Sequence, residues 1–259
     1  MKITRETYKL IGAVHKIECE FATFEIVDGN PIETRHQSAG YSIFDLEGKL
    51  TEEVSPYRLM MYDAYKDKYF YDKKNEISYR EEYDENELLI GKTVFEKLPD
   101  GNRIEKHYYF NNQGKITLGS HTVFEGDNDD KDFIIEMAHY DENENIIPHH
   151  FHKYNQNEKS KKNKVFTANG FTIEEFRNNE NKELTDKYIT SYDLKGNRTE
   201  FSCFDANGKL TLKDEYHYEF DSIRNWTQET QNHWVIGWGE FKLVPLSMTR
   251  RKIDYYHET

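Results

Sequence analysis

The segment Pro148-His149-His150-Phe151-His152 is the clearest place where residue types and spacing could bind a metal ion. On a β-strand, side chains two residues apart point the same way, so His150 and His152 would lie about 7 Å apart. His139, on a neighbouring strand, would be a third nitrogen ligand for zinc. Structural zinc sites usually include cysteines, so the alternative is that these histidines line a polar face or stack across strands. We favour that alternative, and a metal-dependent enzyme centred on His150 and His152 stays as a third function class.

Other patterns for chemistry are incomplete. The loop at 127–132, Asp-Asn-Asp-Asp-Lys-Asp, begins like a calcium loop, but Asp132 occupies the glycine position and Ala138 the position of the last carboxylate ligand. Phosphate loops, dinucleotide fingerprints, nucleophile elbows and paired-cysteine zinc patterns are absent from the sequence. We therefore expect no cofactor, no metal and no catalytic residues, and we expect that the protein is not an enzyme.

Two tryptophans stand four residues apart in the segment 234–241, Trp-Val-Ile-Gly-Trp-Gly-Glu-Phe. Trp234, Trp238 and Phe241 could form an exposed aromatic platform for a protein or a sugar, and they are our candidate binding residues. The alternative, which we favour, is that they cap the end of a sheet, because repeat proteins need a closing element.

The elements that must position these residues follow from a recurring unit: an aromatic residue, Asp or Asn, two free residues, a turn former and a polar residue. Asp or Asn accepts hydrogen bonds from the backbone two residues on, and glycine supplies a positive φ. Such turns between alternating strands predict antiparallel hairpins. The clearest copies begin at Phe44, Phe110, Tyr192 and Phe204, and weaker copies begin at Tyr71, Tyr83, Tyr140, Tyr154, Phe176 and Phe220.

The spacing predicts an all-β protein: a long antiparallel meander of about fourteen hairpin-connected strands, in one domain over 1–259. Within it we expect N-terminal strands in 1–40, repeats in 41–230 and a capping segment in 231–259. Open sheets rarely exceed about ten strands without curling, so the sheet should be strongly twisted and coiled, or wrap toward a barrel. One exception is a capping-box pattern at Thr172, which allows a short helix over 173–180.

The aromatic-Asp-x-x-Gly-x units resemble the tyrosine–aspartate (YD) repeats of the RHS family over roughly residues 40–259. The stretch 216–227, Tyr-His-Tyr-Glu-Phe-Asp-Ser-Ile-Arg-Asn-Trp-Thr, is similar to the closing repeat of short RHS-like bacterial proteins, although Arg224 replaces the turn glycine. The resemblance implies a β-repeat sheet and little about activity. Large members of the family enclose toxins, and this chain is too short for such a shell.

Composition limits the partners. The chain has 35 Lys and Arg against 48 Asp and Glu, a net charge of -13, which argues against binding nucleic acid or an anionic membrane. Its 19 Tyr, 16 Phe and 3 Trp argue for a folded chain despite the high polarity. Two distant cysteines exclude a disulfide framework, and no apolar run suits a signal peptide or a membrane span. We expect a cytoplasmic protein, or an exported one if a leader was removed.

These observations favour a non-enzymatic binding protein whose long face recognises a protein partner, because repeat sheets offer large surfaces and acidic charge steers basic partners. An immunity or antitoxin protein that neutralises a basic bacterial toxin is the most specific version. A carbohydrate or cell-surface binding protein that uses aromatic strips is the alternative. Exposed sheet edges also allow a homodimer through edge strands.

Overall fold

The computed structural model describes residues 4–55, 65–110, 116–126, 134–141, 143–148, 152–153, 161–178, 183–237 and 240–256. The protein is all-β: its elements in these ranges are seventeen β-strands, and within each half of the chain consecutive strands pair antiparallel as a meander. The predicted fold class is therefore confirmed. Within the same ranges, no helix has the length and apolar character needed to cross a membrane.

The chain divides into two compact units. Unit 1 comprises Met1–Glu18, Ala39–Lys159 and Ile253–Thr259, and unit 2 comprises Cys19–Ser38 and Ser160–Lys252. Three strands contribute residues to both units: β1 (Val14–Val27), β2 (Asn30–Phe44) and β17 (Glu240–Tyr255). Among them, β1 pairs with β2 and with β17. The predicted organisation as one domain with three segments stays a prediction.

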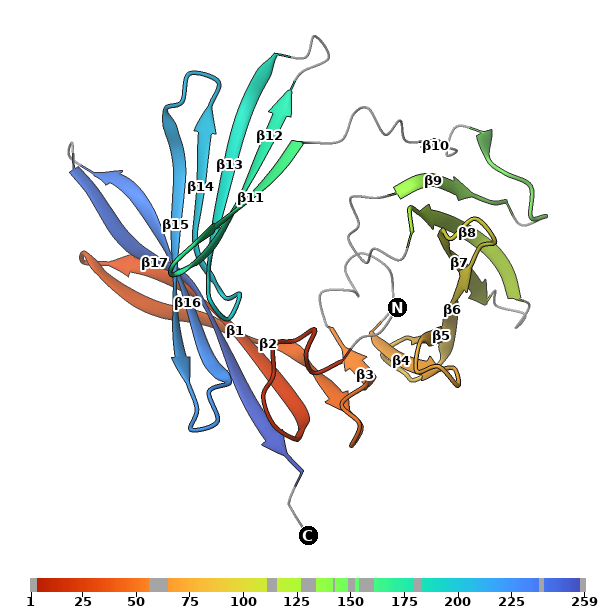
Figure 1. Ribbon diagram of the computed structural model, residues 1–259. Helices are drawn as coiled ribbons and strands as arrows, with labels where there is room; N and C mark the ends of the chain where they lie inside the picture. Colours follow the sequence, from red (N-terminus) through yellow and green to blue (C-terminus); the bar gives the residue numbers. More distant parts are fainter. Residues whose placement is uncertain are drawn as a thin grey trace. The chain divides into compact units, whose positions relative to one another are not determined.

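Unit 1 contains the first half of the meander, in which each strand lies beside the next one along the chain (Figure 1). The pairing runs without interruption from β2 through β3 to β10. The strands are β3 (Leu50–Val54), β4 (Lys66–Tyr71), β5 (Ile77–Tyr83), β6 (Leu89–Lys97), β7 (Arg103–Phe110), β8 (Ile116–Phe124), β9 (Ile134–His139) and β10 (His152–Lys153).

Unit 2 contains the second half, and its strands are longer. Antiparallel pairing runs from β11 to β17. The strands before β17 are β11 (Lys161–Thr167), β12 (Gly170–Asn178), β13 (Leu184–Asp193), β14 (Arg198–Asp205), β15 (Leu210–Phe220) and β16 (Trp226–Gly237).

The short helix allowed over 173–180 is wrong for residues 173–178, which belong to β12. Ile173 pairs with Lys164 of β11 on one side and with Thr190 of β13 on the other. A capping box satisfies only a few backbone groups locally, whereas this strand has a hydrogen-bonded neighbour along both edges. Residues 179 and 180 lie outside the described ranges.

The predicted turn chemistry is present between the strands. At Asp205, one carboxylate oxygen accepts hydrogen bonds from the backbone N–H groups of Asn207 and Lys209, each at 2.9 Å. The backbone between them is closed by a bond from the Gly208 N–H to the Asp205 carbonyl. The same pair of side-chain bonds is made by Asp72, Asp84, Asp141, Asp193 and Asp221.

The third residue after each of these aspartates has a positive φ. The residue is glycine at 196 and 208, but Asn75, Glu87 and Arg224 adopt the same conformation with φ of 62°, 62° and 73°. The aspartate bonds therefore hold the turn closed even where a side chain adds the strain of left-handed backbone.

Each turn also sets the register of its hairpin. The aromatic residue before the aspartate pairs with the residue six positions later, as in Phe44 with Leu50 and Tyr71 with Ile77, and a one-residue bulge follows. The same offset occurs at Tyr83, Tyr192, Phe204 and Phe220. Because side chains alternate between faces, this offset decides which residues of the next strand share a face.

The largest fully buried apolar side chains lie in unit 1, and Phe44 stands where the N-terminal segment meets the turn between β2 and β3. Phe44 is fully buried, the ring of Tyr8 packs edge-on against it at 5.2 Å, and the Tyr256 hydroxyl donates to its carbonyl at 2.6 Å. Leu50, its pairing partner, is also fully buried. Burying a side chain such as Phe44 contributes about 1.5–3 kcal/mol, so this contact anchors the start of the meander.

The strain at the turns makes a stability prediction. A Cβ added at Gly208 would meet no atom within 4 Å, so Gly208→Ala tests only its φ of +78°. We expect a loss of about 1 kcal/mol in the free energy of unfolding, measured by urea titration. Arg224→Gly is the matched reverse and should gain about 0.5 kcal/mol, because relief of strain exceeds the added chain entropy. Equal effects of the same sign would contradict this account.

Candidate functional site

The sheet of unit 1 carries charged side chains on both faces, and one face gathers them into a buried network. Register places Asp67, Glu82 and Gly91 in one row across β4, β5 and β6, and places Tyr69, Arg80 and Thr93 in the next row. We call this side of β3–β7 the Glu82 face. Each strand contributes every second side chain to this face, so the face gathers side chains from several neighbouring strands.

Glu82 is the centre of the network. Its Oε1 accepts from Arg80 Nη2 at 2.7 Å and from the Thr93 hydroxyl at 2.9 Å. His107 Nδ1 lies 3.3 Å from the same oxygen and 3.0 Å from Thr93 Oγ1. A Cβ at Gly91 would come within 3.1 Å of Glu82 Oε2, so glycine leaves room for the carboxylate. The result is a buried anion enclosed by a guanidinium, a hydroxyl and an imidazole.

A second carboxylate pair extends the network toward β3. Asp67 is almost fully buried, and its Oδ2 lies 3.6 Å from Arg80 Nε. The Tyr69 hydroxyl donates to Glu53 Oε2 at 3.2 Å, and the Tyr8 hydroxyl donates to Glu53 Oε1 at 2.7 Å. The N-terminal segment that covers the core therefore also caps this polar row.

The electrostatics of Glu82 favour a permanent negative charge. Burial would raise the pKa of its carboxyl, but the hydrogen bond from His107 and the charge of Arg80 outweigh burial and lower the pKa to about 2. A general acid or base works best with a pKa near the working pH, so this carboxylate is a weak base at neutral pH. The network is thus suited to holding structure and presenting fixed charges.

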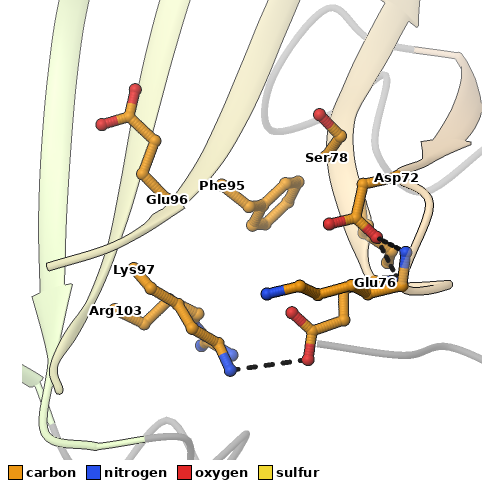
Figure 2. A pocket seen from close by; sticks show the side chains of 9 residues that line it. Asp72, Glu76, Ser78, Phe95, Glu96, Lys97 and Arg103 are labelled. Carbon is orange, nitrogen blue, oxygen red and sulfur yellow. Dashed lines mark hydrogen bonds and ion pairs between the residues drawn. The ribbon is translucent and has the colours of Figure 1, made fainter.

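A pocket of about 210 Å³ opens where the Glu82 face reaches the turn after β4 (Figure 2). Ser78, Phe95 and Arg103 line it from three adjacent strands, and Glu76 lines it from the turn. Figure 2 shows the side chains of Lys97 and Glu76 reaching toward each other, with Nζ and Oε1 3.4 Å apart. The pocket combines one aromatic wall with hydrogen-bond donors and acceptors.

The candidate binding residues from the sequence lie in unit 2. Trp234 is half-buried on β16, where its indole N–H donates to Glu215 Oε1 at 2.9 Å and Lys213 Nζ lies 5.6 Å from its ring. Phe241 belongs to β17, and its backbone pairs with Ile236. Trp238 lies outside the described residues. The structure therefore shows a hydrogen-bonded Trp234, while the shared platform of the three residues stays a prediction.

Of the three histidines in the metal hypothesis, the structure describes His139 and His152 but not His150. His139 lies at the end of β9, paired with Ser120. The backbone of His152 in β10 pairs with Met137 of the same strand β9. His150 and the acidic loop at 127–132 lie outside the described residues.

In the described part of unit 2, Glu20, Glu33 and His36 offer atoms within 4.8 Å of one another, the spacing a metal ion would need. Arg250 already occupies this cluster, with both guanidinium nitrogens on Glu33 and Nη1 3.6 Å from Glu20. The hydrogen bond from Arg250 lowers the pKa of the Glu33 carboxyl. A resident cation therefore stands where a metal ion would bind.

Sequence analysis missed the Glu82 face entirely. In Ser78-Tyr79-Arg80-Glu81-Glu82, charged residues fall on both faces of β5, so alternation does not reveal which carboxylate is buried. The available signal was Gly91, a glycine inside a strand, which often marks the close approach of another group.

Comparison with known proteins gives no family. No family model matches the chain, and no curated protein matches it. Among solved structures, it is similar to a porin-like protein from Bacteroides uniformis, with 11% identity over 95% of this chain and 99% of that one, and a TM-score of 0.37. A protein of unknown function from Bacteroides fragilis has 11% identity over 56% of this chain and 85% of that one, with a TM-score of 0.20. Scores this low carry no argument about function.

The resemblance to the YD repeats of the RHS family is therefore wrong as an assignment. No family model matches the chain, and the solved structures to which it is similar are a porin-like protein and a protein of unknown function. The physical reason is that the aromatic-Asp-x-x-Gly-x unit encodes a turn. Any antiparallel meander can use the same hydrogen bonds, so the motif identifies local geometry and not a family.

The network makes a pH prediction. A carboxyl whose pKa falls from 4.5 to about 2 on folding stabilises the protein above pH 4.5, and loses that contribution as the pH drops through this interval. Glu82→Gln should cost about 2–3 kcal/mol at pH 7 and flatten the decline in stability between these pH values. Urea unfolding at several pH values measures both.

Glu81→Gln is the matched control, since Glu81 lies on the opposite face of the same strand and accepts from the Tyr83 hydroxyl at 2.7 Å. This variant should cost less than about 1 kcal/mol and keep the acid transition of the original protein. A Glu82→Gln protein with an unchanged acid transition would show that the network contributes no linkage.

Proposed function

We propose that this chain is a non-enzymatic binding protein that recognises a basic protein partner through unit 1. One observation carries the proposal: the negative charge is concentrated in that unit. Unit 1 holds 30 acidic against 19 basic residues, and unit 2 holds 18 against 16. Net charges of -11 and -2 follow, so a cationic partner would be attracted mainly by unit 1.

The local charges of unit 1 support the proposal. At the turns, Glu47 and Glu87 are more than two-thirds exposed, although each has a lysine nearby. Long-range steering depends on the summed charge rather than on single pairs, and complementary fields raise the association rate more than the final affinity.

An immunity or antitoxin role is the specific form of this proposal, with a basic bacterial toxin as the partner. Its support is charge complementarity, because toxins that act on nucleic acid carry the basic surface that such a substrate requires.

The first test is capture of partners from native cell extract on the immobilised full-length chain at low salt. We expect a basic protein that is released as salt is raised, because exposed charge pairs are screened beyond about 10 Å at 0.1 M salt. Recovery of acidic or neutral proteins alone, or of a partner whose binding ignores salt, would contradict the proposal.

The second test uses the captured partner in stopped-flow or surface association measurements. The double variant Glu85→Gln, Glu144→Gln removes two exposed charges of unit 1, and Glu25→Gln, Glu219→Gln removes two of unit 2. We expect the first to slow association several-fold at low salt with little change in dissociation, and the second to have less than half that effect. Equal slowing by both would assign recognition to net charge alone and not to unit 1.

A further inference from the structure

We propose that the pocket between the turn after β4 and strands β5–β7 binds a single neutral sugar ring. This inference is independent of the protein partner proposed above. It rests on three properties of the pocket: an aromatic wall, rigid donors and acceptors, and charges that are mostly paired within the protein.

The aromatic wall is Phe95. It lies two residues after Thr93 on β6, and therefore on the Glu82 face, and it is half-buried. Figure 2 shows its ring among the side chains that line the pocket. The face of an aromatic ring is electronegative and attracts the polarised C–H groups that cover one side of a pyranose. A ring-shaped ligand can stack here.

The donors and acceptors are held in place before any ligand arrives. Arg103 is nine-tenths buried, its guanidinium lies 4.5 Å from the Phe124 ring, and its Nη2 is 3.3 Å from Glu105. Asp72 Oδ1 is fixed by two backbone N–H groups at 2.8 and 2.9 Å. Ser78 adds a hydroxyl that both donates and accepts. Such fixed groups reduce the entropy lost on binding a small polar ligand.

The pairing of the charges selects against ions. Lys97 is paired with Glu76 at 3.4 Å and Arg103 with Glu105 at 3.3 Å, while Asp72 and Lys74 carry opposite charges on the same turn. Glu96 bonds to Lys106 at 2.7 Å, and Figure 2 shows it pointing away from the pocket. An anion or a cation would meet like charges on one side, whereas hydroxyl groups can donate to the carboxylates and accept from the cations.

The size limits the ligand to one ring. A cavity of about 210 Å³ has the volume that about seven molecules occupy in liquid water. This accommodates a monosaccharide, or the terminal residue of a longer glycan, and not two rings side by side. With so few contacts, affinity should be in the millimolar range, as for ligands that gain about 4 kcal/mol.

The test is saturation-transfer NMR with calorimetry on the full chain. The neutral probes are methyl β-D-glucopyranoside, methyl β-D-galactopyranoside and methyl α-D-mannopyranoside, and the charged probes are glucuronate, glucosamine and inorganic phosphate. We expect saturable millimolar binding of at least one neutral glycoside and weaker binding of the charged probes. Tighter binding of phosphate or glucuronate, or no saturable binding of any neutral glycoside, would overturn the proposal.

Variants locate the binding. Phe95→Ala should weaken it about tenfold, and Ser78→Ala, a smaller change that removes one hydrogen bond, should weaken it several-fold. Phe220→Ala in unit 2 is the aromatic control and should leave it unchanged. Thermal unfolding checks that each variant is folded. If Phe95→Ala is unfolded, Ser78→Ala decides. Unchanged binding in a folded pocket variant, or equal loss in the Phe220→Ala control, would place the sugar elsewhere and reject the pocket.

Discussion

The hydrogen bonds from backbone N–H groups to the turn aspartates are the interaction on which this structure depends. Each carboxylate oxygen accepts from the second and fourth following residues, as at Asp72 and Asp205, and closes a turn of fixed length. That length sets the six-residue offset between the aromatic residue and its partner. Since a shift of one residue would exchange the two faces of every following strand, the turns determine which side chains meet.

The Glu82 network shows what this register achieves. Arg80, Thr93 and His107 come from three consecutive strands, yet they surround a single carboxylate. Such a group is costly to bury alone and tolerable only when its partners are in place. The sheet of unit 1 therefore gains specificity from polar contacts in a region where apolar side chains are few. Among its buried apolar residues, Phe44 and Leu50 are the ones that anchor the turn between β2 and β3.

The two proposals both rest on charged and polar groups, but these groups act over different distances. A surplus of carboxylates over unit 1 as a whole acts at long range and suits a large basic partner. In the pocket, most charged groups are already paired within the protein, and short-range hydrogen bonding and stacking on Phe95 dominate. Charge that is uncompensated over a unit and compensated within a pocket can therefore serve two ligands of different kinds.

The sequence by itself determined the all-β class, the antiparallel meander and the turn positions. These features depend on contacts within about six residues, such as Asp205 with Lys209, and local spacing records them directly. Local patterns were wrong where strands distant in the sequence determine the structure. The capping box at Thr172 predicts a helix, but the segment lies in β12, because pairing with β11 and β13 satisfies its backbone hydrogen bonds. The family assignment was wrong for a related reason, since the motif describes a turn.

The candidate site was not predicted from the sequence, in which Gly91 was the one available signal. Glu81 and Glu82 are adjacent and chemically identical, and only Arg80 on the same face of β5, with Thr93 of β6 and His107 of β7, makes one of them a buried anion. The pocket likewise requires Ser78, Phe95 and Arg103 to converge from three strands. Tertiary structure alone decided these groupings, because register brings together residues that are far apart in the chain and carries no local signature.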